Sequence, residues 1–280
     1  MPSIRNSYLF GRINLYASDE TIKNKFDFFV SSLNTKVVVT KYKFSYGFFD
    51  VIVVDQHQQF LSGNLVKWRS ELENEVVDQK KHIISEARLP DAVVGKSDFY
   101  IHVPSGIIAY HPISNKISDQ QFRDIFTELI INANERFFVG IKFEVINEQI
   151  RLIDAINKLD KIFTVSFSVH PTNPSNRDVF KDIDERIKRL NAGEYSSTIE
   201  AKSTEGLNRQ ALQDDEFLSG IYMAADGYGD AMVSGIKGGR EITIYTKNSP
   251  IKKSIEKSED RITILNRLRE MFERIQNRGK

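Results

Sequence analysis

The sequence predicts an α+β protein in which a strand-rich N-terminal domain, residues 1–135, precedes a C-terminal domain of alternating strands and helices, residues 136–280. With 280 residues and 40% hydrophobic content, the chain can bury one large core or two smaller ones. Its first half contains β-branched and aromatic runs with a two-residue period, which is typical of strands. Its second half repeats a strand-like run followed by an amphipathic helix, and this change of rhythm predicts two domains.

The N-terminal domain is expected to begin with a strand, a helix and a hairpin. Residues 9–16 alternate as a strand does, and Ser18 before two acidic residues is typical of a helix N-cap. Apolar side chains then recur three and four residues apart, which predicts one buried helix face. Residues 37–44 and 48–54 predict two strands joined by a hairpin turn at Ser45-Tyr46-Gly47.

The middle of the N-terminal domain combines strands with one charged stretch. Residues 61–68 predict a strand, whereas residues 71–86 lose the period and gather charges, which favours an exposed and mobile strand or loop. Residues 99–103 and 107–110 predict a second hairpin, because Pro104-Ser105-Gly106 between them supplies the backbone dihedrals of a turn.

A helix is expected to close the N-terminal domain. Ser118 and Gln121 have the spacing of a capping box, and apolar residues follow at helical spacing. The pattern ends near Asn134, which sets the expected domain boundary.

The C-terminal domain is expected to alternate strands with helices. The strands span residues 137–145, 163–169 and 196–201, and the helices span residues 148–159, a segment after Asn173-Pro174, and residues 207–225. The helix after Pro174 predicts a buried stripe at Val179, Ile183, Ile187 and Leu190. Gly227 is expected to end the last of these helices in a left-handed conformation.

A hairpin and a helix are expected at the C-terminal end. Gly238-Gly239 permits positive φ at both positions of a tight turn, which predicts a hairpin over residues 236–242. Ser258 is expected to cap a final helix whose packed side includes Ile262 and whose arginines face solvent or a partner.

Composition and motifs argue against several classes of site. The chain has no cysteine, which rules out disulfides and thiolate metal sites and favours the cytoplasm. No apolar run approaches the roughly 20 residues of a membrane helix, so no membrane partner is expected. The five histidines never stand at the four-residue spacing of a helical metal site. Since phosphate-loop and nucleophile motifs are also absent, we expect no metal and no cofactor and favour a protein that is not an enzyme.

Glu200-Ala201-Lys202 is a fragment that matches part of a catalytic motif. Its E-x-K form ends the signature of metal-dependent nucleases, in which a carboxylate holds Mg²⁺ and a lysine stabilises charge on phosphate. The signature also needs an upstream aspartate on a neighbouring strand, and Asp178, Asp182 and Asp184 fall on a predicted helix. A nuclease centred on Glu200 and Lys202 is therefore an alternative rather than the leading hypothesis.

Positive charge gathers in the last quarter of the chain, although the net charge of the whole chain is only +1. One interpretation is an ordinary solvated face with a Glu270–Arg274 pair on the final helix. The other is a phosphate-binding surface whose affinity comes from counterion release and is independent of DNA sequence. The cations nominated for it, on the hairpin, the following connector and the final helix, are Lys237, Arg240, Lys247, Lys252, Lys253, Arg267, Arg274 and Arg278.

Two segments carry a resemblance to known proteins. These are His170-Pro171-Thr172-Asn173-Pro174, at the exit of a predicted strand, and the hairpin over residues 235–246. With the short terminal helix, they resemble a group of uncharacterised bacterial and prophage proteins whose plan is similar to the Rex exclusion protein A of lambdoid phage. The resemblance implies duplex DNA binding, a homodimer, and a role in phage defence or abortive infection.

The leading hypothesis is a DNA-associated phage-defence protein that binds duplex DNA without strong sequence preference. The first alternative is the divergent metal-dependent nuclease centred on Glu200 and Lys202. The second is a protein-interaction subunit whose uneven surface charge serves a partner protein of a defence system or a dimer interface.

Overall fold

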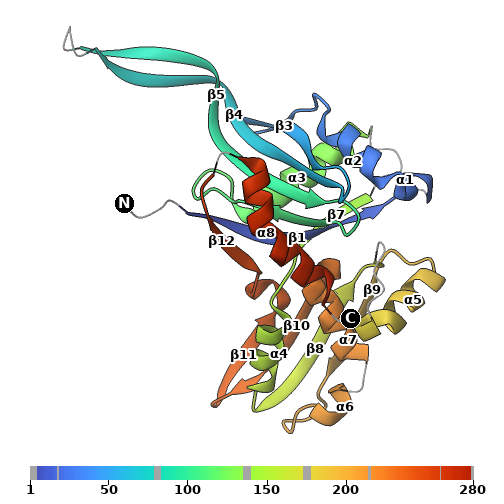
Figure 1. Ribbon diagram of the computed structural model, residues 1–280. Helices are drawn as coiled ribbons and strands as arrows, with labels where there is room; N and C mark the ends of the chain where they lie inside the picture. The colour runs from blue at the N-terminus through green and yellow to red at the C-terminus, as the bar shows by residue number, and fades with distance from the viewer. Residues whose placement is uncertain are drawn as a thin grey trace. The chain divides into compact units, whose positions relative to one another are not determined.

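The computed structural model describes residues 5–17, 19–78, 83–134, 140–172, 178–213, 216–258 and 260–278, and its fold is α+β, as predicted. The chain forms two compact units (Figure 1). Unit 1 contains Met1–Leu15, Ser105–Ala109 and Lys142–Lys280, and unit 2 contains Tyr16–Pro104 and Tyr110–Ile141. The expected boundary at residues 135/136 lies near the passage from unit 2 to unit 1, but two earlier segments also belong to unit 1.

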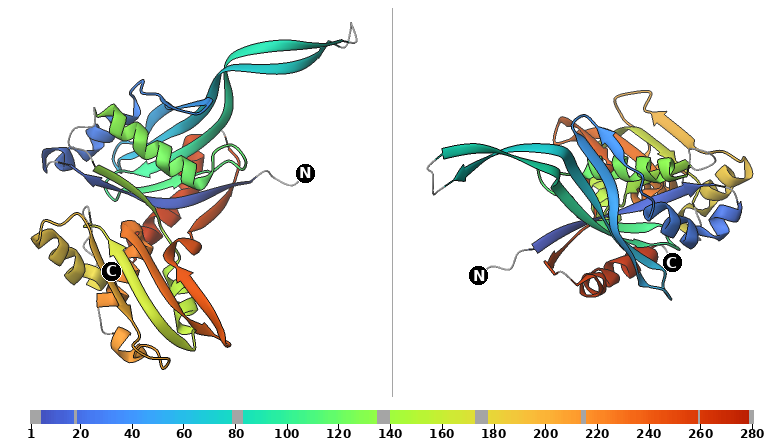
Figure 2. Two further views of the ribbon diagram at one scale, coloured as in Figure 1. Left: turned by 180° about the vertical axis from the view of Figure 1, so that it is seen from behind. Right: turned by 90° about the horizontal axis from the view of Figure 1, so that it is seen from above.

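Unit 2 is an antiparallel sheet with helices against it. Its strands, in the order β5-β4-β3-β2, are β2 (Val39–Lys41), β3 (Phe44–Asp55), β4 (Phe60–Asp78) and β5 (Ile83–His102). Its helices are α1 (Asp19–Lys23), α2 (Lys25–Leu33) and α3 (Asp119–Ala133), and α3 lies across one face of the sheet (Figure 2). The Phe126 ring on α3 packs edge-on against Phe48 at 5.1 Å and Phe99 at 5.5 Å, which places aromatic side chains at the centre of this core.

The predicted start of α3 is confirmed. The Ser118 hydroxyl accepts a hydrogen bond from the Gln121 backbone N–H at 3.2 Å, as an N-cap does. The Gln121 side chain donates to the Tyr46 hydroxyl at 2.8 Å, so it ties the helix to β3.

Two other expectations for unit 2 are wrong. The first hairpin turns at Tyr42-Lys43, and Ser45-Tyr46-Gly47 lies inside β3, where Lys41 pairs with Phe44 and Val39 with Tyr46. The first helix is interrupted at Asn24, which separates α1 from α2. The expected cap, Ser18, lies outside the described residues.

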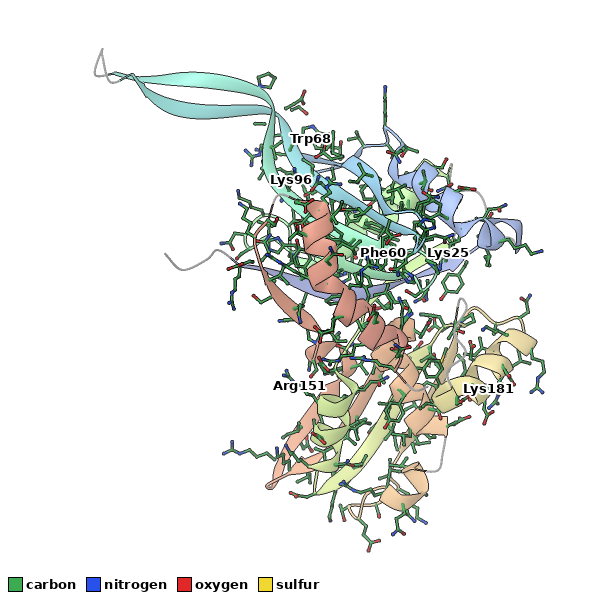
Figure 3. All side chains as sticks on the ribbon, viewed as in Figure 1. Lys25, Phe60, Trp68, Lys96, Arg151 and Lys181 are labelled. Atoms are coloured by element: carbon green, nitrogen blue, oxygen red, sulfur yellow. The ribbon has the colours of Figure 1, made fainter. Side chains whose placement is uncertain are left out.

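Strands β4 and β5 continue beyond the rest of their sheet as a two-stranded arm (Figure 1). They pair from Phe60 and His102 to Asp78 and Ile83, whereas β3 accompanies β4 only as far as Trp68. Figure 3 labels Trp68 near the base of this arm. The strand alternative for residues 71–86 is therefore confirmed at every position except residues 79–82, which lie outside the described part of the chain.

One sheet of unit 1 joins segments from both ends of the chain. Strand β1 (Arg5–Tyr16) lies between β12 (Lys252–Glu256) and β6 (Ile107–Tyr110), and β7 (Gly140–Val145) also pairs with β1. The stretch expected to be a connector is thus strand β12, in which Lys252 pairs with Leu9. Gly106, with φ of 67°, closes the predicted turn before β6.

Helix α8 (Arg261–Gln276) packs on β1, where the Phe272 and Phe10 rings meet edge-on at 5.5 Å. The prediction that Ser258 caps this helix is wrong, because Asp260 is the N-cap. The Asp260 carboxylate accepts hydrogen bonds from the backbone N–H groups of Ile262 and Thr263 at 3.2 and 2.9 Å. This start leaves Ile262 exposed rather than packed.

The second sheet of unit 1 has the strand order β11-β10-β8-β9. Its strands are β8 (Lys161–Val169), β9 (Tyr195–Glu200), β10 (Gly229–Lys237) and β11 (Arg240–Tyr245). The associated helices are α4 (Gln149–Asn157), α5 (Lys181–Arg189), α6 (Arg209–Gln213) and α7 (Glu216–Met223). The turn between β10 and β11 is confirmed, with φ of 56° at Gly238 and 76° at Gly239.

A β-bulge in β8 sets which side chains of this sheet face the helices. Ser234 pairs with Thr164 but the next residue, Gly235, pairs with Ile162, so Phe163 is the extra residue. Ile162 and Val165 therefore both face the side covered by α4, α6 and α7.

The helices of this unit depart from the sequence expectation in two places. Of the helix expected over residues 207–225, residues 209–213 and 216–223 are helical, whereas Ala224–Tyr228 form a π-helical turn in which Gly227 adopts the predicted left-handed φ of 84°. Residues 214–215 lie outside the described residues. The helix after Pro174 begins with a 3₁₀ turn, Asp178–Phe180, which offsets the expected stripe: Val179 and Leu190 are exposed. Residues 173–177, including Asn173-Pro174, lie outside the described residues.

The π-helical turn meets β1 through a buried ion pair. The Arg12 guanidinium donates to the Asp226 carboxylate at 2.9 Å, to the Asp226 carbonyl at 2.7 Å and to the Ser105 carbonyl at 3.0 Å. It also lies 4.5 Å from the centre of the Tyr228 ring. Because Arg12 and Asp226 are both buried, this network holds three separate segments of unit 1 together.

Candidate nucleic-acid interface

One end of the β11-β10-β8-β9 sheet carries a cation on each strand. Arg240 opens β11 and is the cross-strand partner of Lys237, which closes β10. Lys161 opens β8 beside Ile236, and Lys202 follows β9 two residues after Glu200. We name Arg240, Lys237, Lys161 and Lys202 the cationic sheet end. With strands about 4.8 Å apart, it spans about 14 Å.

The side chains of the cationic sheet end are exposed, and none forms an ion pair among the described residues. Strand alternation directs Arg240 to the helix-covered face, since it stands two residues from the core-packed Ile242. Lys161 precedes buried Ile162 and leaves from the opposite face, where its ammonium donates to the Thr204 carbonyl at 2.8 Å. At the ends of strands, such long side chains can reach around the sheet to a common ligand.

Carboxylates at the same end limit the local net charge. Asp160 accepts a hydrogen bond from the Gly238 N–H at 2.6 Å, so it supports the hairpin turn. The others near these strand ends are Glu200, Glu205 and Glu241. Binding of an anion would therefore depend on individually placed cations more than on a strong overall field.

Four of the other nominated cations are already paired with carboxylates. The pairs are Lys253–Glu270 at 3.1 Å, Arg267–Glu256 at 3.8 Å, Arg274–Glu148 at 2.7 Å and Arg278–Glu148 at 3.7 Å. Glu270 thus pairs with Lys253 instead of the expected Arg274. Arg278 also donates to the Asn147 carbonyl at 2.8 Å. Each carboxylate already neutralises the positive charge that would attract a phosphate. These four side chains are therefore poorer phosphate ligands than those of the cationic sheet end.

The remaining two nominated cations lie at the opposite end of the hairpin. Lys247 follows β11, with its ammonium 5.4 Å from the Tyr245 ring, and Lys252 opens β12. The length of β11, about 17 Å, separates them from Arg240. The eight nominated cations therefore do not form one continuous surface.

The nuclease fragment occupies part of the cationic sheet end. Glu200 closes β9 and is exposed, and Lys202 lies two residues beyond it. Across the described ranges, no group of three or more histidine, aspartate and glutamate side chains is arranged to hold a metal ion. A metal-dependent nuclease centred on Glu200 would therefore have to hold its metal with fewer than three side-chain ligands from the described part of the chain.

A polar cluster at the end of β8 has a different chemistry. The Lys142 ammonium lies 2.9 Å from Nε2 of buried His170 and 3.3 Å from the Glu194 carboxylate. Burial and then the Lys142 charge lower the pKa of His170, so the imidazole is neutral and accepts from the ammonium. The Ser168 hydroxyl donates to Glu194 at 2.5 Å and lowers the pKa of that carboxyl. The Ser168 hydroxyl is thus bonded to a carboxylate whose pKa is lowered, and such a carboxylate is a weak base for activating a serine.

Residues 7–273 match the family model described as Domain of unknown function (DUF4747), which spans segments of both units. The chain belongs to this family. No curated protein matches the DUF4747 chain. Neither finding bears on the resemblance to phage exclusion proteins, which stays a prediction. No described helix of the DUF4747 chain is both long and apolar enough to cross a membrane.

Sequence reasoning missed half of the cationic sheet end of this DUF4747 chain. Lys161 was not nominated, and Lys202 was considered only as a catalytic residue. Lys161 stands at the first position of a strand, but its proximity to Lys237 depends on the register of two strands that are far apart in the sequence. The sequence signal that could have indicated this surface was a cation near the start or end of each predicted strand.

Proposed function

We propose that this DUF4747 protein binds duplex DNA through backbone phosphates, without strong sequence preference, at the cationic sheet end. The observation that carries the proposal is the row of four exposed cations on adjacent strands, none of them ion-paired among the described residues. Lysine and arginine contacts to phosphates give affinity and register but carry no sequence information.

The dimensions of this row support the proposal. Its span of about 14 Å corresponds to about four base-pair steps of 3.4 Å, measured along the axis of B-DNA. Each strand end offers one cation, so a phosphate backbone lying across the four strands could meet Arg240, Lys237, Lys161 and Lys202 in turn. Lys158, exposed at the end of α4, adds a charge beside Lys161.

Binding of a short random-sequence duplex, followed by fluorescence anisotropy at low salt, tests the proposal. The Lys161→Gln/Lys202→Gln variant should bind more weakly for unrelated sequences alike. The matched control is Arg151→Gln/Arg189→Gln, which removes two exposed cations elsewhere in unit 1 (Arg151 is labelled in Figure 3). Equal binding by the parent protein and the Lys161/Lys202 variant would refute the site.

The same reactions, repeated with Mg²⁺ and examined for cut DNA, test the nuclease alternative. Intact DNA under every divalent metal tried would remove that alternative. Cleavage that Glu200→Gln abolishes would replace simple binding with catalysis as the function of this surface.

The role in phage defence and the homodimer rest on the resemblance alone and stay proposals. Expression of the chain in a susceptible host should reduce phage plating, and the Lys161→Gln/Lys202→Gln variant should restore it if DNA binding is required. The molar mass in solution, from light scattering, decides between a monomer and a homodimer. A cytoplasmic location also stays a prediction.

A further inference from the structure

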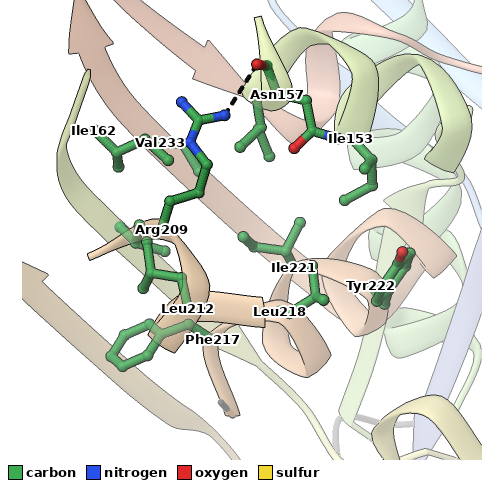
Figure 4. A pocket seen from close by; sticks show the side chains of 12 residues that line it. Ile153, Asn157, Ile162, Arg209, Leu212, Phe217, Leu218, Ile221, Tyr222 and Val233 are labelled. Atoms are coloured by element: carbon green, nitrogen blue, oxygen red, sulfur yellow. Dashed lines mark hydrogen bonds between the residues drawn. The ribbon is translucent and has the colours of Figure 1, made fainter. Parts of the chain in front are cut away.

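A pocket of about 300 Å³ lies between the second sheet of unit 1 and helices α4, α6 and α7 (Figure 4). Its floor is made of buried aliphatic side chains from the sheet, among them Ile162 and Val233. Ile221 and Leu218 of α7 and Ile153 of α4 form facing walls. The β8 bulge contributes to this floor because it turns both Ile162 and Val165 to the same side.

Among the described residues that line the pocket, Arg209 is the only charged one. Its guanidinium donates to the Asn157 carbonyl at 2.9 Å and to the Leu159 carbonyl, so it is held at the C-terminal end of α4 (Figure 4). These two bonds use two of the five N–H donors of an arginine. A fixed guanidinium with remaining donors beside an apolar cavity is suited to an anionic group carried on an apolar body.

We propose that this pocket binds an amphipathic monoanion, an alkyl or aryl carboxylate, whose apolar part fills the cavity and whose carboxylate bonds to Arg209. The class of ligand follows from the lining: apolar side chains favour a hydrocarbon, and the single cation at the pocket favours one negative charge. This inference does not depend on DNA binding by the cationic sheet end.

The volume limits the size of the ligand. An apolar cavity of 150 Å³ accommodates benzene, and a water-sized volume of liquid is about 30 Å³, so 300 Å³ holds about ten non-hydrogen atoms. Octanoate, with ten non-hydrogen atoms, matches this size and is the probe of choice. Acetate has the charge without the apolar body, and octan-1-ol has the body without the charge.

Titration of octanoate into the methyl-labelled full chain, followed by NMR, tests the site. Saturable shifts should occur at the methyl groups of Ile153, Ile221 and Val233, and acetate should cause none. Arg209→Gln should weaken octanoate binding about tenfold, which is the loss expected for one charge-assisted hydrogen bond, and should change octan-1-ol binding less than twofold. Arg209→Lys, which keeps the charge, should retain most of the affinity.

A second variant keeps the test independent of the helix contact made by Arg209. Leu218→Trp fills the pocket from its half-exposed wall and should abolish octanoate binding, with the Arg151→Gln variant as a control that binds normally. Absence of pocket shifts up to about 5 mM octanoate would overturn the proposal. Equal affinity for octanoate and octan-1-ol would overturn the role of Arg209.

Discussion

Neutralising the hairpin tip should reduce the salt dependence of DNA binding by a predictable amount. Lys237→Gln/Arg240→Gln removes two of the four cations of the cationic sheet end while leaving Gly238 and Gly239, which form the turn, unchanged. Each phosphate neutralised contributes about −0.9 to the slope of log affinity against log salt, so four contacts give a slope of about −3.6 and two give about −1.8.

These slopes convert into a large difference in affinity. Raising the salt from about 50 to about 200 mM should weaken binding by the parent protein roughly 150-fold, but binding by the variant only about twelvefold. Fluorescence anisotropy of a random-sequence duplex over this series measures both slopes, and Arg151→Gln/Arg189→Gln should keep the parental slope. A variant slope equal to that of the parent would show that the tip does not contact phosphate. A similar loss in Lys247→Gln/Lys252→Gln would extend the surface to the other end of the hairpin.

Three further predictions concern stability, each measured by urea denaturation. Asp260→Ala should lower the free energy of unfolding because the helix loses its N-cap, whereas an equal loss in Ser258→Ala would contradict that assignment. Arg12→Met should lower the free energy of unfolding by about 3–5 kcal/mol, because it leaves the Asp226 carboxylate buried without its guanidinium. The double variant Arg12→Met/Asp226→Leu should recover part of this loss. A loss below about 1 kcal/mol in Arg12→Met would refute the role of the pair. The pKa of His170 in the folded chain is lowered below 6.5, so the unfolded chain binds more protons, and the free energy of unfolding should fall as the pH drops through about 6.5. His170→Gln should reduce this fall. An unchanged pH profile in that variant would exclude His170 as its source.

Local signals predicted the elements whose geometry depends on one or two residues. Ser118 caps α3, Gly227 takes the left-handed conformation after α7, and Gly238-Gly239 forms the β10–β11 turn. Each is a backbone requirement that a particular residue type meets within a few positions. The first hairpin was misplaced for the converse reason. Its turn contains Tyr42 at φ of 58°, a conformation that is uncommon for tyrosine, whereas the glycine that suggested a turn, Gly47, lies within β3.

The candidate site was predicted less well because it depends on contacts between distant parts of the chain. Arg274 is neutralised by Glu148, which is 126 positions away, so no local pattern indicated that it would be paired. Similarly, Lys161 lies beside the hairpin only through the register of β8 and β10, including the bulge at Phe163. The charge of a segment is readable from sequence, but the charges that surround it require the fold.

The pairing of β1 with β12 delays completion of unit 1 during synthesis. At about 5–20 residues per second, a ribosome needs on the order of 10–50 s to make the chain between these two strands. Throughout that interval, Tyr8 and Phe10, which are fully buried in the finished protein, lack the α8 and β12 contacts that cover them. The nascent chain therefore presents an apolar strand with an unpaired edge, which is a target for chaperones and a hazard for aggregation whenever translation is slow.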